Sequence, residues 1–504
     1  MSSVKSDLPI IGHYIAGQLV PGQAPFQAVY NPALGVASAR VSLADRVVVE
    51  ETIAATQSAF PAWSATPPQK RAQILFRFKQ LLEANADALV ELITAEHGKV
   101  LDDARGELGR GIEVVEYACG ISELLKGEHS KNAGPSIDSW SEFQALGVVA
   151  GITPFNFPAM VPMWMFPMAI ACGNTFVLKP SERDPSVALK LAELFTEAGL
   201  PAGVFNVVNG DKTAVDVLLN DSRIHGVSFV GSTPIAESIY RQGTSNGKRV
   251  QALGGAKNHA VIMPDADIEG AADALMGAAY GSCGERCMAI SVAVCVGDDL
   301  ADKLIANLKP KVAALKIGPG SDTSNDMGPV ITEAARARIF DYIDQGLAQG
   351  AELVIDGRGH VVKGYEDGFF MGGCLFDKVT DAMSIHSDEI FGPVLCVVRV
   401  ETLEQAMHII NRHEFGNGTC IFTRDGETAR YFSDNIHVGM VGINIALPVP
   451  VSSQSFGGWK RSLFGDLYVY GPDAVRFYTR RKTITQRWPS AGARDGVKYS
   501  FPSS

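Results

Sequence analysis

The first quarter of the chain has a helical pattern of apolar residues. Between residues 43 and 126, apolar side chains recur at three- and four-residue spacing, which is typical of amphipathic helices. Gly98, directly after His97, is a residue type that commonly ends a helix. We therefore expect helices over residues 43–63, 70–98 and 101–125.

The pattern changes near Pro154, where short apolar strands begin to alternate with helices. This alternation predicts a parallel, doubly wound α/β sheet, and such sheets bind ligands at the carboxyl ends of their strands. The expected strands are residues 147–153, 175–180, 204–210, 226–231 and 248–255, with a Met- and Ala-rich helix and helices from about Ser186, Lys212 and Pro234 between them.

A second α/β region follows Lys257. It contains an Ala/Gly-rich helix at 268–282, a strand at 290–298 and a helix at 299–315, and similar signals continue to residue 424. We expect the boundary between the two regions at residues 255–260. The tail at 475–488 alternates apolar and polar residues, which predicts an extended strand at a sheet edge or in an intersubunit pairing.

One long stretch, from Phe143 to Leu178, carries no charged residue. It is long enough for a membrane span, which needs about 20 residues. Four prolines inside it would repeatedly break the backbone hydrogen bonding that lipid demands. We therefore expect a buried core broken by turns.

Composition narrows the possible functions. The 504 residues include 44 basic and 55 acidic side chains, a net charge of −11, which excludes general attraction to nucleic acid. Eight cysteines form no CxxC pair and no Cys/His ligand cluster, so we expect a reducing compartment and no metal site. The first residues match neither a signal nor a transit peptide, which favours a cytoplasmic protein.

Polar residues follow two neighbouring expected strands. Gly231 and Ser232 precede a helix, whose N-terminus can bind phosphate. Lys179 and Glu182 follow the strand at 175–180 and suit the oxygens and hydroxyls of an adenosine ribose. Each feature alone is also compatible with an ordinary turn or solvated loop, but together they favour NAD.

Cys287, in the segment GSCGERCMA, is the candidate nucleophile. A thiol with an ordinary pKa of about 8.5 attacks as its thiolate, so a neighbouring cation such as Arg286 would help. Cys283 has no such neighbour, and we interpret it as a packing residue.

Seven motifs, in order, extend this interpretation: PFNFP, VLKPSE, SFVGST, LGGAKNH, YGSCGERC, DEIFGPV and SFGGWKRS. Their order and spacing resemble the aldehyde dehydrogenase superfamily. Within it, the chain is most similar to the CoA-acylating methylmalonate-semialdehyde (malonate-semialdehyde) dehydrogenases.

The resemblance implies an α/β fold with three parts. These are a Rossmann-like NAD-binding domain, an α/β catalytic domain and a small β element for bridging and oligomerisation. A homo-oligomer, either a dimer or a tetramer, is expected. The implied division is residues 1–130 and 150–255 for NAD binding, 256–470 for catalysis, and 131–149 and 475–495 for the oligomerisation strands.

The resemblance also assigns roles to residues. Cys287 matches the catalytic thiol, and Asn156 matches the side chain that forms the oxyanion hole with the Cys287 N–H. Arg110 and Arg286 match the pair that holds a substrate carboxylate; Glu107 lies close enough in sequence to pair with Arg110. The implied NAD contacts are Phe155, Lys179, Glu182, Gly231, Ser232, Glu389 and Phe391.

A base that hydrolytic family members use is missing. The position before LGG that carries their glutamate is Ala252, and a second such position near the C-terminus is Val469. Alanine cannot move a proton, so a thiol such as coenzyme A is the expected acceptor of the acyl group.

The predicted reaction is NAD-dependent oxidation of malonate or methylmalonate semialdehyde, with loss of CO2, to acetyl-CoA or propanoyl-CoA. Three alternatives stay open: a hydrolytic enzyme that recruits another base, an acylating enzyme for a simple aldehyde, and a catalytically silent nucleotide-binding scaffold. We expect the protein to bind a small-molecule substrate and to have no nucleic-acid or membrane partner.

Overall fold

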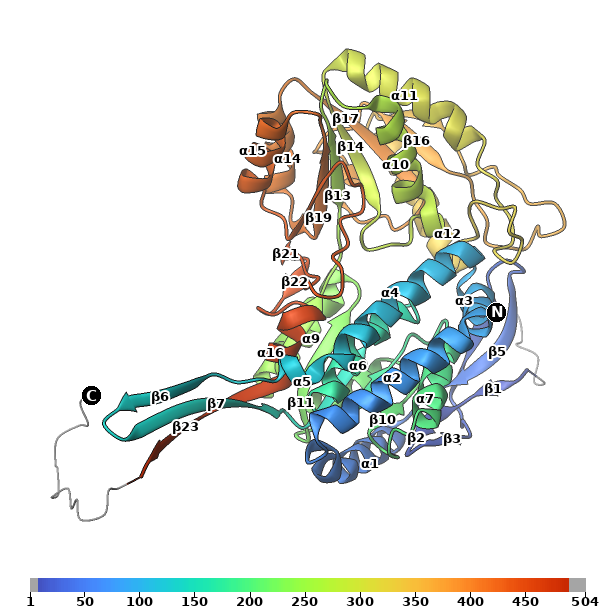
Figure 1. Ribbon diagram of the computed structural model, residues 1–504. Helices are drawn as coiled ribbons and strands as arrows, with labels where there is room; N and C mark the ends of the chain where they lie inside the picture. The colour runs from blue at the N-terminus through green and yellow to red at the C-terminus, as the bar shows by residue number, and fades with distance from the viewer. Residues whose placement is uncertain (1–7, 489–504) are drawn as a thin grey trace.

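The computed structural model describes residues 8–488. Figure 1 shows two α/β units, one above the other, and a long β ribbon that extends from the side of the lower unit. The lower unit contains the helices expected in the first quarter of the chain. Its helices, with the small α5, are α1 (Arg46–Ser64), α2 (Pro68–Ala84), α3 (Ala86–His97), α4 (Leu101–Cys119), α5 (Ile121–Leu124), α6 (Met160–Ala171), α7 (Ser186–Glu197), α8 (Lys212–Asn220) and α9 (Thr233–Ser245).

The lower unit is built on an eight-stranded sheet. Its five central strands, β12 to β10 in spatial order, are parallel, and short antiparallel strands close both edges. Strands β8 and β9 are buried along their whole length, as expected for a parallel sheet covered on both faces. In spatial order the strands are β22 (Leu463–Phe464), β12 (Arg249–Leu253), β11 (Ile224–Val230), β8 (Val148–Ile152), β9 (Thr175–Lys179), β10 (Phe205–Val207), β2 (His13–Ile15) and β3 (Gln18–Val20).

The upper unit contains a seven-stranded sheet, parallel except at β15. In spatial order its strands are β15 (Glu352–Ile355), β16 (Cys374–Asp377), β17 (Val394–Val400), β14 (Ile290–Val296), β13 (Asn258–Ile262), β19 (Gly418–Phe422) and β20 (Met440–Ile443). The helices of this unit are α10 (Ile268–Tyr280), α11 (Asp298–Ala313), α12 (Glu333–Ala348), α13 (Ser384–Ser387), α14 (Leu403–Arg412) and α15 (Gly426–Asn435). The last helix, α16 (Gly471–Tyr478), packs against α6 in the core of the lower unit.

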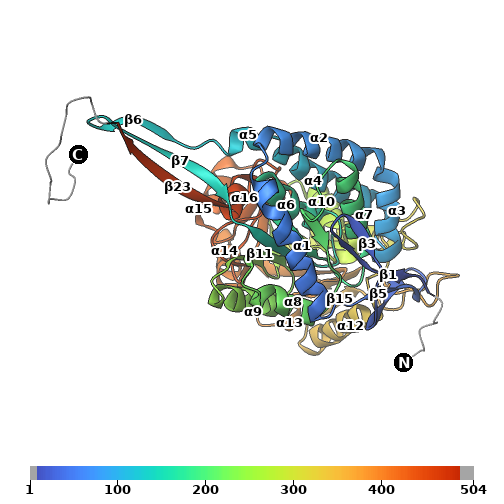
Figure 2. The same ribbon diagram turned by 90° about the horizontal axis from the view of Figure 1, so that it is seen from below.

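The projecting ribbon is an antiparallel sheet of three strands, seen from below in Figure 2. Its longest pairing joins β23 to β7 over nine residues, from Thr479 opposite Ala145 to Arg487 opposite Ile137. The ribbon strands are β6 (His129–Gly134), β7 (Ile137–Ala145) and β23 (Thr479–Arg487); two further small sheets contain β1 (Ile10–Ile11), β5 (Val36–Ser42) and β4 (Phe26–Asn31), and β18 (Phe415–Gly416) and β21 (Trp459–Lys460).

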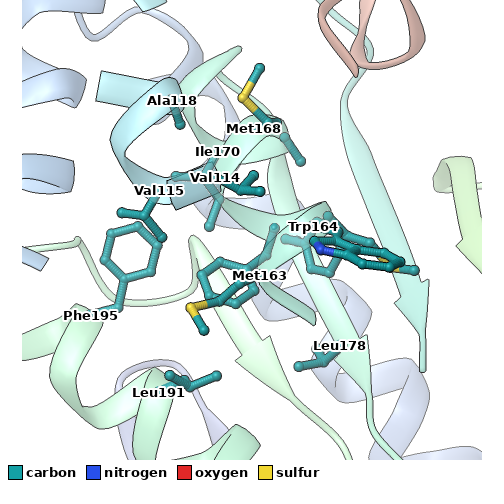
Figure 3. Close-up of a cluster of buried hydrophobic side chains, with 14 of the residues drawn as sticks. Val114, Val115, Ala118, Met163, Trp164, Met168, Ile170, Leu178, Leu191 and Phe195 are labelled. Atoms are coloured by element: carbon teal, nitrogen blue, oxygen red, sulfur yellow. The ribbon is translucent and has the colours of Figure 1, made fainter. Parts of the chain in front are cut away.

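The uncharged stretch forms the centre of the lower unit. Every residue of α6 is buried, and a helix that is apolar all round is stable only inside a core. Figure 3 shows Met163, Trp164 and Met168 of α6 among buried side chains of α4, β9 and α7. Gly111 of α4 allows this contact, because a Cβ there would lie 2.2 Å from the Met163 methyl group.

Within residues 8–488, no helix is long and apolar enough to cross a membrane.

Four sequence expectations need correction at their boundaries. The helix expected over 101–125 is α4 and the short α5, which are divided at Gly120. The helix expected over 70–98 is two helices, because the chain turns at Asn85 (φ −107°) before α3 begins. Val475–Tyr478, expected in the tail strand, end α16, where Phe477 and Tyr478 are buried. Val148 and Val149, assigned to the oligomerisation element, belong to β8 of the large sheet. Residues 489–495 of the expected tail lie outside the described residues.

We expect Phe195→Ala to destabilise the lower unit strongly. Phe195 is fully buried and stacks on Phe78 with ring centroids 4.2 Å apart, and such truncations typically cost about 3–5 kcal/mol. The free energy of unfolding, measured with denaturant, checks this. Phe76→Ala is the matched control, because Phe76 is 53% exposed on the same helix as Phe78; equal losses in the two variants would contradict the expectation.

Candidate active site

Cys287 lies where two cavities meet. The first, which we call the strand-end cavity, has a volume of about 380 Å³. It is lined by residues that follow strands of the first sheet, such as Asn156 and Gly231, and by Glu389 from the segment before β17 of the second sheet. The second, which we call the α4 cavity, also has about 380 Å³ and is lined by Arg110 and Arg286. A thiol between them can reach ligands bound on either side.

The backbone around Cys287 is firmly held. A short 3-10 turn, Gly281–Gly284, follows α10, and Ser282 and Cys283 have left-handed φ angles of 50° and 55°. After this turn, the Cys287 carbonyl accepts hydrogen bonds from the Asn258 and Asn417 side-chain amides, at 2.9 and 3.1 Å. Cys283 is buried in the upper core, in agreement with its interpretation as a packing residue.

The thiol of Cys287 is protonated in this environment. Burial raises its pKa to about 12, and the Glu389 carboxylate raises it further, while backbone hydrogen bonds and Arg286 oppose the increase. Arg286 alone is therefore insufficient to form the thiolate at neutral pH. An additional positive charge beside the sulfur would lower the pKa.

Asn156 lies on a turn between β8 and α6 and is 3% exposed. Its backbone carbonyl accepts a hydrogen bond from the Lys99 ammonium at 2.7 Å. Lys99 also pairs with Glu107 at 2.6 Å, and both of these side chains are fully buried. The second Glu107 oxygen accepts from the Ala159 and Met160 amides. Glu107 thus supports the Asn156 turn and pairs with Lys99, not with Arg110.

The expected ribose ligands lie in a groove of about 520 Å³, which we call the β9 groove. Lys179, at the end of β9, pairs with Glu182 at 2.9 Å. Burial alone would raise the pKa of Glu182, but the Lys179 ammonium holds it below its usual range. Gly231 and Ser232, between β11 and α9, line both this groove and the strand-end cavity.

The aromatic and acidic residues expected at the cofactor ring also come together. Phe155 and Phe391 contact edge to face with centroids 5.9 Å apart, and both line the strand-end cavity. Phe391 has a left-handed φ of 56°. One Glu389 oxygen accepts from the Ala256 amide at 2.9 Å, and burial raises the pKa of this carboxyl.

Both expected carboxylate ligands lie in the α4 cavity, and each already has an acidic partner. Arg110 pairs with Glu113 at 2.7 Å and also donates to the Val449 and Pro450 carbonyls. Arg286 pairs with Asp103 at 2.5 Å and donates to the Gly277 carbonyl. A substrate carboxylate would share these guanidinium groups with the protein's own acids.

Sequence reasoning missed several residues of the strand-end cavity. Glu285, two residues before the nucleophile, is buried there, and burial raises its pKa to about 8. Arg183 lies 5.0 Å from the Phe155 ring centroid, and Arg338 donates to the Ile390 carbonyl. The sequence could have indicated Glu285, because this acidic residue stands beside the nucleophile in the GERC motif. It gave no indication of Arg338, which lies in α12, outside the quoted motifs.

The two positions of the missing bases are apolar and enclosed. Ala252, at 0% exposure, packs with Val250 and Phe229 in a separate apolar cluster. Val469 is 1% exposed and forms a β-bridge with Phe456. Within the described part of the chain, no group of three or more His, Cys, Asp or Glu side chains is placed to hold a metal ion.

Comparison with known proteins places this site in a family. The model of the aldehyde dehydrogenase family matches residues 20–484. The chain therefore belongs to the aldehyde dehydrogenase family, which confirms the predicted family and enzyme class. TM-scores of 0.90–0.95 to solved structures of this family confirm the predicted fold.

Within the family, the similarity is to semialdehyde dehydrogenases. The chain is 66% identical over 491 residues to malonate-semialdehyde dehydrogenase from Pseudomonas aeruginosa, covering 97% of this chain and 99% of that one. It is 64% identical to the crystal structure of methylmalonate-semialdehyde dehydrogenase from Oceanimonas doudoroffii, with TM-score 0.95 and coverage of 96% and 99%. A Sinorhizobium meliloti relative, crystallised with NAD, is 54% identical with TM-score 0.95 and the same coverage.

We expect alkylation of Cys287 by iodoacetamide to accelerate with pH without levelling off. Because burial raises the thiol pKa to about 12, the thiolate fraction should rise about tenfold per pH unit between about pH 7 and 10. Mass spectrometry of the labelled protein measures this, with Cys287→Ser as the control for the other, buried cysteines. A plateau below about pH 9 would contradict the raised pKa.

Lys99→Met should destabilise the protein markedly. The change leaves the buried Glu107 carboxylate without its cation, and breaking a buried pair in this way costs about 3–5 kcal/mol. Denaturant unfolding provides the measurement. In the control Lys79→Met, which breaks a more exposed helical pair with Glu83, the loss should be under about 1 kcal/mol; a similarly small loss for Lys99→Met would refute the structural role of the pair.

Proposed function

We propose that this chain catalyses the NAD-dependent, CoA-acylating oxidation of malonate or methylmalonate semialdehyde, with decarboxylation to acetyl-CoA or propanoyl-CoA. One observation carries the proposal: Cys287 lies between a cavity with nucleotide-ligand chemistry and a cavity with two arginines. The similarity to malonate- and methylmalonate-semialdehyde dehydrogenases supports the substrate class.

The donor set of the β9 groove fits NAD. Lys179 and Glu182 would bind the adenosine ribose, and an ionised Glu182 would repel a 2′-phosphate. The α9 N-terminus, with Gly231 and Ser232, would hold the pyrophosphate. Glu389, Phe155 and Phe391 would contact the nicotinamide end of the cofactor. When bound, NAD supplies the hydride acceptor and a cationic ring near the thiol.

The chain's own groups would then perform the acyl chemistry. The Cys287 sulfur, as its thiolate, adds to the aldehyde carbon. The Asn156 side-chain amide and the Cys287 N–H donate to the resulting oxyanion, and losing one such donor typically costs about a hundredfold in rate. Loss of hydride from the carbon leaves a thioester on Cys287.

The thioester makes decarboxylation possible, because its carbonyl is β to the substrate carboxylate and accepts the electron pair of the breaking C–C bond. The enolate that forms then takes up a proton from solvent at its α-carbon, which gives the acetyl or propanoyl thioester. Arg110 and Arg286 would orient that carboxylate. Their charges are already shared with Glu113 and Asp103. This sharing suits a site that must bind a carboxylate and then release it as CO2.

Acyl transfer to CoA follows from the missing base. With Ala252 and Val469 at the hydrolytic positions, a thiol nucleophile is favoured over water. Glu285, however, lines the same cavity as Cys287 with a pKa of about 8, and this observation favours the hydrolytic alternative as the second candidate. The simple-aldehyde enzyme and the silent scaffold are weaker, because neither explains two arginines beside an intact thiol.

The proposal includes the assembly and location of the enzyme. The β6–β7–β23 ribbon extends away from the body (Figures 1 and 2), and its outer edges suit pairing within a homodimer or homotetramer. All eight cysteines are free thiols, which supports a reducing, cytoplasmic location. The division into NAD-binding, catalytic and oligomerisation parts given above, with Val148 and Val149 moved to the NAD-binding part, belongs to the same proposal.

The decisive assay follows NADH formation from malonate semialdehyde with and without CoA, and identifies the product. We expect sustained turnover only with CoA, and acetyl-CoA as the product, because no base at residue 252 activates water. A free acid formed at an undiminished rate without CoA would establish the hydrolytic alternative. A second experiment uses Arg110→Leu to test the substrate class. We expect this variant to turn over the semialdehyde more slowly, and unchanged turnover would favour a simple-aldehyde substrate.

A further inference from the structure

Three side chains on one face of α4 contact three different parts of the site. Asp103, Glu107 and Arg110 are spaced by four and three residues, so they lie along one side of the helix. Glu107 holds the oxyanion turn, and Arg110 lines the α4 cavity. Asp103 has a separate connection, to the segment that carries the nucleophile.

The Asp103 carboxylate binds two groups of that segment at once. One oxygen accepts the Ser282 backbone N–H at 2.8 Å, and the other pairs with the Arg286 guanidinium at 2.5 Å. Asp103 and Arg286 are largely withdrawn from water, with side-chain exposures of 23% and 16%, so solvent screens this pair less than a surface ion pair. One carboxylate therefore links α4 to both ends of the turn before Cys287.

The turn that Asp103 holds is conformationally strained. Ser282, Cys283 and Gly284 have consecutive left-handed φ angles, and the first two are not glycine. Such a conformation persists only where neighbouring groups enforce it. The guanidinium of Arg286 lies against this turn, since a Cβ on Gly281 would be 2.5 Å from its Nη1. Apart from Asp103, the side chain of Arg286 is held by the Gly277 carbonyl.

We propose that Asp103 is a positioning residue, which sets the place of Arg286 in the α4 cavity by binding its guanidinium and the Ser282 amide together. The inference rests on the proposed function, because it takes Arg286 as a ligand of the substrate carboxylate. Asp103 then governs how well the enzyme distinguishes an aldehyde with a carboxylate from an uncharged one.

The test compares kcat/KM for malonate semialdehyde with kcat/KM for propanal, which has the same number of carbons and no carboxylate. In Asp103→Asn, we expect the ratio of the two values to fall by about tenfold or more, the effect of losing a hydrogen bond to a charged group. The fall should come mainly from a higher KM for the semialdehyde. Asp87→Asn is the matched control, because it makes the same charge change on the neighbouring helix α3, at a side chain that is 83% exposed and does not line the α4 cavity.

A double-mutant cycle shows whether Asp103 acts through Arg286. In an Arg286→Ala background, Asp103→Asn should change the ratio no further. Equal losses for both substrates, or the same loss of ratio in the Arg286→Ala background, would overturn the inference and leave Asp103 a general structural role. If Asp103→Asn does not fold, Asp103→Glu keeps the charge but displaces it; an unchanged ratio in that variant would overturn the inference too.

A different experimental result would contradict the proposed function. Free acid in place of acyl-CoA would overturn the acylating reaction, whereas the ratio in Asp103→Asn would still decide the positioning role. Conversely, an unchanged ratio in Asp103→Asn together with a lowered ratio in Arg286→Ala would overturn the role of Asp103 and support the proposed substrate.

Discussion

The buried ion pair between Lys99 and Glu107 is the interaction on which the site depends. Removing two charges from water is costly unless every donor and acceptor is satisfied. Here the Lys99 ammonium binds Glu107 and the Asn156 carbonyl and lies 4.4 Å from the Phe157 ring centroid. The remaining Glu107 oxygen binds the amides that begin α6. A single pair thus joins α4, the oxyanion turn and the most apolar helix of the core.

Charges throughout the site are held by other charges. Lys179 has Glu182, Arg110 has Glu113, and Arg286 has Asp103. Such pairing keeps the polar groups oriented before any ligand arrives, which is how fixed dipoles and charges act most effectively in a site shielded from water. Cys287 is the exception, because backbone hydrogen bonds and Arg286 do not offset the burial and the Glu389 charge that raise its pKa to about 12. The free protein therefore keeps its nucleophile in the unreactive form.

Local patterns predicted most helices and strands, because these depend on short-range rules. The family resemblance, not the local pattern, assigned roles to the motif residues, and those roles stay predictions. Parallel strands end at one edge of a sheet, so Asn156, Gly231 and Glu182 had to converge once the strands were identified. The contact between Asp103 and Arg286 was not predictable in this way, since 183 residues separate the two. Glu107 is near Arg110 in the sequence, but in the structure it pairs with Lys99. Both side chains of this pair are fully buried, which the spacing of residues in the sequence does not reveal. The strand prediction for the start of the tail was wrong for a similar reason. Val475–Tyr478 were expected to be extended, but they end α16, with Phe477 packed in the core.

The glycines of α4 differ in what they permit. Gly109 has no atom within 4 Å of the place a Cβ would occupy, whereas at Gly111 a Cβ would collide with Met163. A side chain at residue 109 would therefore fit without any change in the position of α4. At residue 111 a Cβ would lie 2.2 Å from the Met163 methyl group, so the end of that side chain would have to leave its place in the core. The packing of α4 against α6 therefore constrains residue 111, a position that carries no charge and does not line the α4 cavity.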